Sequence, residues 1–90
     1  MDTNEVVNKI IAASIKGILY TDRAERDIKR AHFTEELIKK LLFSPRKVEE
    51  ADLNTYILYG KKTARLKVEI TAEGSLLIHW FEYNKVAFLA

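Results

Sequence analysis

Apolar residues in the first half of the chain recur at three- and four-residue intervals, which is the spacing of one face of an α-helix. This pattern predicts helices over residues 4–16, 22–32 and 34–43. Gly17 is expected to end the first helix, and Pro45 to stop the third, because proline disfavours a helical residue before it. Polar residues precede each helix as candidate N-caps: Asp2, Thr3 or Asn4 for the first, Thr21 or Asp22 for the second, and Thr34 for the third.

After Pro45 the apolar pattern changes to a period of two residues, and β-branched and aromatic residues become more frequent. We therefore predict strands over residues 46–50, 54–59, 62–71 and 75–83, with 86–89 as a candidate for one more. The links between them are short enough for hairpins, which favours an antiparallel arrangement. The predicted fold class is α+β, with two or three N-terminal helices on one face of a three- to five-stranded antiparallel β-meander.

The length and composition narrow the class of protein. Ninety residues predict a single domain over 1–90, and 48% hydrophobic with 31% charged residues is typical of a soluble globular chain. The absence of cysteine excludes disulfides and thiolate metal sites, and the sequence offers no motif for a metal or a cofactor. No run approaches the roughly 18 apolar residues of a membrane span, so the expected location is cytoplasmic, with no membrane partner.

The last long strand is apolar on both sides if it alternates regularly. Leu76, Ile78 and Trp80 would then face one way, and the other side would carry Leu77, His79, Phe81 and Tyr83. A strand of this kind is either central and covered on both faces or part of a subunit contact. We expect a homodimer on this basis, with interface residues Leu77, Phe81, Val86 and Phe88.

Basic residues are concentrated in the middle of the chain, where eight lysines and arginines stand against three carboxylates between Lys39 and Lys67. The net charge is only +2, so any affinity for a polyanion depends on where these charges lie. One interpretation is a nucleic-acid surface in which cations hold phosphates and an aromatic ring stacks on a base. Its candidate residues are Lys61, Lys62, Arg65, Lys67, Tyr83 and Lys85. The alternative is a solvated sheet face with its turn.

Two further groups each allow two interpretations. His79 is a candidate general acid or base, or else a hydrogen-bonded structural histidine. In the second predicted helix, Arg23, Arg26 and Arg30 form a basic stripe that could bind an anion. The same helix also carries i, i+4 pairs of opposite charge, which is typical of an exposed helix face.

Without a zinc motif or a nucleophile elbow, the remaining catalytic option is metal-independent RNA cleavage.

The stretch from Tyr20 to Tyr83 resembles an uncharacterised family grouped with the RelE/ParE-like toxin fold, whose motif reads T-x-H-A-x-x-R-M-x-x-R-G-I. The resemblance covers most of the chain. The positions that agree are mainly structural: Thr21, Ala24, Thr34, Ile38, Pro45, Tyr59-Gly60, Leu66, Val68 and Ile70. Ile28 and Phe33 replace the motif's methionine and isoleucine. Its ionisable positions differ, since Arg23 stands for the histidine, Asp27 for the first arginine and Ala31-His32 for the arginine-glycine pair.

This resemblance implies a RelE-like fold and messenger RNA on the ribosome as a target, with an antitoxin as a protein partner. The basic and aromatic residues of such toxins correspond by location to Lys62, Arg65, Lys67, His79 and Tyr83. We therefore expect a small domain that binds RNA or a ribonucleoprotein surface through a basic sheet edge, as a degenerate toxin or endoribonuclease. The alternative is a non-catalytic protein-binding module or inhibitor, of viral or mobile-element type, that acts through its apolar C-terminal strand.

Overall fold

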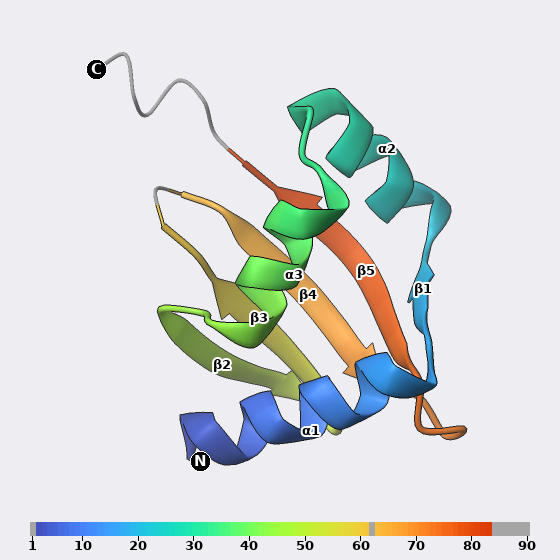
Figure 1. The fold of residues 1–90 in the computed structure, drawn as a ribbon, viewed down its shortest axis with the longest axis vertical. Helices are drawn as coiled ribbons and strands as arrows, with labels where there is room; N and C mark the ends of the chain where they lie inside the picture. Colours follow the sequence, from blue (N-terminus) through green and yellow to red (C-terminus); the bar gives the residue numbers. More distant parts are fainter. Residues whose placement is uncertain (1, 62, 84–90) are drawn as a thin grey trace.

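Three helices cover one face of a five-stranded sheet in the computed structural model, which describes residues 2–61 and 63–83 (Figure 1). The elements in chain order are α1 (Thr3–Lys16), β1 (Ile18–Tyr20), α2 (Asp22–Ala31), α3 (Glu35–Phe43), β2 (Lys47–Asp52), β3 (Thr55–Tyr59), β4 (Arg65–Ile70) and β5 (Leu76–Glu82). The fold class is α+β, as the sequence indicates. The three helices and four of the strands lie close to the ranges expected for them, and the candidate strand 86–89 lies outside the described residues.

The helices begin at side-chain caps that the sequence offered as alternatives. The Asp2 carboxylate accepts a hydrogen bond from the Asn4 amide at 3.0 Å. The hydroxyl oxygens of Thr21 and Thr34 accept in the same way at the starts of α2 and α3. Each cap satisfies one of the amide groups that have no partner inside the first helical turn.

The sheet is mixed, with strand order β1-β5-β4-β3-β2. Strands β2 to β5 pair antiparallel with their neighbours in the chain, whereas β1 runs parallel to β5, with Ile18 opposite Leu76 and Tyr20 opposite Ile78. The expectation of a purely antiparallel sheet is therefore wrong at this edge. A strand of three residues is too short to show an alternating pattern, and its partner lies at the far end of the sequence.

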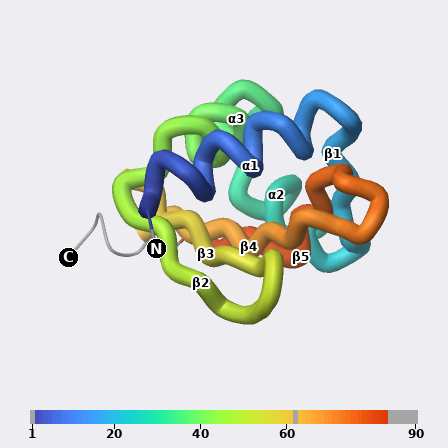
Figure 2. The backbone as a smooth tube through the Cα atoms, turned by 90° about the horizontal axis from the view of Figure 1, so that it is seen from below, coloured from blue at the N-terminus to red at the C-terminus, as the bar shows by residue number. Residues whose placement is uncertain are grey.

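The hydrophobic core lies between the helices and the sheet face that they cover (Figure 2). From the helices, Ile10, Ile38 and Leu42 are almost completely buried. From the sheet, the matching fully buried side chains are Leu58, Leu66, Val68, Leu76 and Ile78. The opposite face of the sheet carries no helix among the described elements, and we call it the open face.

A β-bulge in β5 changes which side chains reach the core. Lys67 pairs with Trp80, and the next residue of β4, Val68, pairs with Ile78, so His79 is an extra residue in β5. Beyond the bulge the alternation reverses, and Phe81, only 2% exposed, joins the core side with Leu76 and Ile78. The regular alternation expected for this strand is therefore wrong after His79, and Trp80 moves to the open face.

Candidate nucleic-acid interface

The open face combines charged, aromatic and apolar side chains from four adjacent strands. Its members are exposed or half-buried and alternate along each strand with the buried residues: Lys47, Glu49, Ile57, Tyr59, Arg65, Lys67, Glu69, Leu77, His79, Trp80 and Glu82. At the sheet edge, Leu19 of β1 pairs with Leu77 and is 53% exposed. The face therefore has the mixed chemistry of a contact surface more than that of a uniformly solvated sheet.

Trp80 is where two basic regions of the sequence meet. The guanidinium carbon of Arg65, in β4, lies 5.8 Å from the centroid of the Trp80 ring, and that of Arg23, in the first turn of α2, lies 5.9 Å from it. Both distances are within the range of a cation–π interaction. Arg23 of the α2 stripe and Arg65 of the basic sheet edge thus meet at one indole ring.

Arg65 is also held by a carboxylate. Its Nη2 donates to both carboxylate oxygens of Glu82, each at 3.0 Å, and the two residues face each other across β4 and β5. The hydrogen bonds and the charge of Glu82 raise the pKa of Arg65 above its ordinary value. Arg65 therefore carries a full positive charge, and Glu82 occupies part of the guanidinium edge that a phosphate would use.

His79 pairs with Glu69 on the same face. Its Nε2 lies 2.7 Å from Glu69 Oε1, and the two side chains are 31% and 37% exposed. This contact accounts for His79 as a hydrogen-bonded histidine of the sheet, which is one of the two interpretations that the sequence allows. A carboxylate in this position also orients an imidazole, so the candidate catalytic role stays a prediction.

The other candidate nucleic-acid residues that the structure describes, Lys61, Lys67 and Tyr83, lie in different places. Lys67 lies half-buried on the open face, opposite Trp80 in the strand register, and Lys61 is exposed in the turn after β3. Tyr83 lies away from the open face, because its ring packs 4.9 Å from that of Phe33 at the edge of the core. Lys62 and Lys85 lie outside the described residues.

The two expected interface residues that the structure describes, Leu77 and Phe81, lie on opposite faces of the sheet. Leu77 is half-buried on the open face, whereas Phe81 is in the core and packs with its ring centroid 4.5 Å from that of Phe33. The bulge turns Phe81 inward, so it is buried within the chain, and its interface role stays a prediction. Along Leu76 to Ile78, β5 is also paired on both sides, by β1 and β4, so this stretch offers no free edge to a partner strand. Val86 and Phe88 lie outside the described residues, and the homodimer stays a prediction.

Sequence reasoning missed the position of Trp80 at the meeting point of Arg23 and Arg65. It placed Trp80 on the side opposite His79, because regular alternation gives no sign of a bulge. It treated Arg23 as part of a separate helical stripe. A lone tryptophan after a histidine carries no signal for this arrangement, and only the packing of α2 beside the end of β5 brings the residues together (Figure 1).

The described part of the chain shows neither a metal-ligand cluster nor a membrane-spanning helix. Across residues 2–61 and 63–83, the His, Asp and Glu side chains form no group of three or more that could hold a metal ion. In the same residues, no helix has the length and apolar character needed to cross a membrane.

Comparison with protein-family models, with curated proteins and with solved structures gives no match to this chain. The resemblance to RelE/ParE-like toxins consequently stays a prediction.

Proposed function

We propose that this protein binds single-stranded RNA on the open face of its sheet, with Trp80 as the stacking platform. The observation that carries this proposal is the convergence of Arg23 and Arg65 on the Trp80 ring, at 5.9 and 5.8 Å. An aromatic ring with two guanidinium groups over it suits a nucleotide chain, because a base can stack on the indole in place of one guanidinium while the arginines hold neighbouring phosphates.

Lys67 extends this surface along β4, since it lies opposite Trp80 in the strand register. The three cations lie together, although Arg23 and Arg65 pair with Asp27 and Glu82 and the whole chain has a net charge of only +2. Affinity for a polyanion then comes from local charge and falls as salt rises. Single strands are favoured over duplexes, because only unstacked bases offer a face to the indole.

Trp80 is the one tryptophan of the chain, so its fluorescence reports directly on this surface. We expect quenching when a single-stranded RNA oligonucleotide is titrated at low salt, and a dissociation constant that rises with salt. A DNA oligonucleotide of the same sequence shows whether the 2′-hydroxyl contributes. Absence of quenching and of binding at low salt would rule out the proposal.

The matched comparison uses two double variants that remove the same charge. Arg23→Ala/Arg65→Ala takes both guanidinium groups from Trp80, and should weaken binding about 10-fold or more, because two phosphate contacts are lost. Arg26→Ala/Arg46→Ala removes two exposed arginines that contact no ring within the described residues, and should have a much smaller effect. Equal weakening by both variants would show that only overall charge matters. Circular dichroism checks that each variant folds.

A further inference from the structure

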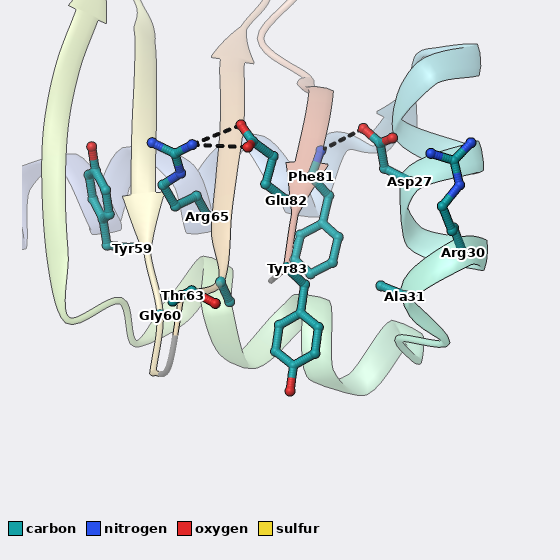
Figure 3. A pocket seen from close by; sticks show the side chains of 11 residues that line it. Asp27, Arg30, Ala31, Tyr59, Gly60, Thr63, Arg65, Phe81, Glu82 and Tyr83 are labelled. Carbon is teal, nitrogen blue, oxygen red and sulfur yellow. Dashed lines mark hydrogen bonds and ion pairs between the residues drawn. The ribbon is translucent and has the colours of Figure 1, made fainter. Parts of the chain in front are cut away.

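A recess opens beside the open face, between α2, the β3–β4 turn and the end of β5 (Figure 3). Its volume is about 840 Å³, which lies within the roughly 300–1,000 Å³ of small-molecule sites. Asp27, Arg30 and Ala31 form the α2 wall, and Tyr59 and Arg65 lie on the opposite side. We call this recess the α2–β5 pocket.

The carboxylates of the pocket already have partners. Asp27 Oδ2 accepts a hydrogen bond from the Phe81 amide at 3.3 Å and lies 3.7 Å from Nε of Arg23. Glu82 is held by Arg65. Arg30, by contrast, is exposed at the rim and makes no ion pair with any carboxylate in the described part of the chain. The pocket therefore presents one uncompensated cation and favours an anionic ligand.

The remaining wall is apolar and aromatic. Tyr83 is half-buried along one side, and its ring packs against that of Phe33. Phe81 also lines the pocket but is only 2% exposed, so Tyr83 supplies the ring that a ligand can contact. Such a wall accepts a planar ring, and the guanidinium of Arg30 matches the bidentate geometry of a phosphate. Arg65 and Glu82 belong both to this pocket and to the open face, so the pocket adjoins the surface around Trp80.

We infer that the α2–β5 pocket binds the phosphorylated terminal nucleotide of the RNA strand, with Arg30 on the terminal phosphate and the base against the aromatic wall. This inference depends on the proposed function for the rest of the strand. It adds a preference for strands that end in a phosphate, and it makes Arg30 the residue that reads this group.

The first test uses free nucleoside monophosphates as probes, followed by ¹H–¹⁵N NMR. We expect shifts of the amides that line the pocket, such as those of Ala31 and Thr63, and weaker binding of the matching nucleosides and of inorganic phosphate alone. Arg30→Ala should weaken binding about 10-fold, as for loss of a charged hydrogen-bonding partner. Lys29→Ala removes a neighbouring exposed cation of α2 that does not line the pocket, and should change affinity less than about twofold.

The second test compares RNA oligonucleotides with a 5′-phosphate, a 3′-phosphate or hydroxyl groups at both ends, using Trp80 fluorescence. One of the phosphorylated strands should bind more tightly, and Arg30→Ala should remove that difference while binding through Trp80 persists. RNA that binds with no preference for a terminal phosphate, or equal effects of Arg30→Ala and Lys29→Ala, would overturn the pocket assignment alone. Mononucleotide binding in the pocket without any binding of RNA would instead overturn the proposed function.

Discussion

The hydroxyl of Thr21 donates a hydrogen bond to the backbone carbonyl of His79 at 2.6 Å, and accepts one from the Ala24 amide at 3.0 Å. One side chain thus joins the start of α2 to the bulged residue of β5. The side chains proposed to bind RNA lie close to this link, since Arg23 comes two residues after Thr21 and Trp80 directly follows His79. The link therefore holds the two halves of the proposed RNA surface in register.

Replacement of Thr21 tests this link. Thr21→Ala loses the helix cap and leaves a part-buried carbonyl without its donor, so the free energy of unfolding should fall by about 1–3 kcal/mol. Thr21→Ser keeps the hydroxyl, so its free energy of unfolding should fall by much less. Urea unfolding of both variants measures the difference, and an equal loss for the two would show that the methyl group, and not the hydrogen bonds, stabilises the junction.

His32 ends α2 in the left-handed conformation, with φ 57°. A side chain at such a position costs about 1–2 kcal/mol relative to glycine, part of which is offset by the greater freedom of glycine in the unfolded chain. His32→Gly should therefore raise the free energy of unfolding by about 0.5–1 kcal/mol. His32→Ala keeps a Cβ and should give no gain. If thermal melting shows the same change for both, the backbone conformation is not the cause.

Stability should fall at alkaline pH through Tyr20. Burial, followed by the nearby negative charge of Glu35, raises the pKa of Tyr20 above its ordinary value of 10.0. Its contribution to stability is full below the pKa of the unfolded chain, because both states are then neutral. That contribution is lost as pH rises through the folded pKa, because the unfolded state ionises first.

Tyr20→Phe should consequently lose less stability than the parent between pH 9 and pH 11 or so, in unfolding experiments at a series of pH values. Glu35→Gln removes the second cause, and should move the Tyr20 pKa back towards its ordinary value, as followed by phenolate absorbance. An alkaline loss of stability that is identical in Tyr20→Phe and the parent would assign the effect to other groups.

Glu82 should restrain RNA binding, because its carboxylate holds the Arg65 guanidinium in two hydrogen bonds. Glu82→Gln removes the charge at nearly constant size, and should tighten RNA binding about threefold or more. Glu49→Gln removes an equal charge from the same face, where the carboxylate contacts Lys47 and Tyr59 instead. Fluorescence titrations of the two variants distinguish release of Arg65 from a general effect of charge. An equal gain in RNA affinity for both would show that release of Arg65 is not the cause.

Local chemistry in the sequence was enough to predict most of the elements. The three helices follow from apolar spacing and from caps such as Thr21 and Thr34, which act within a few residues of the chain. Strand β4 follows from the alternation of Leu66, Val68 and Ile70 with charged residues, because one face of that strand is buried and the other is not.

Tertiary structure decided three features that local patterns do not encode. Strand β1 exists because three residues after Gly17 find a parallel partner in β5, and no pattern within three residues can announce it. The bulge at His79 exchanges the sides of Trp80 and Phe81, so one ring enters the core and the other reaches the open face. The convergence of Arg23 and Arg65 on Trp80 requires α2 to pack beside the end of β5.

The sequence by itself therefore determined the three helices and four of the five described strands, and that basic and aromatic residues are present. It did not determine which of them share a surface. Secondary structure depends on interactions between near neighbours, whereas the proposed site is made by contacts across the sheet between residues far apart in the chain.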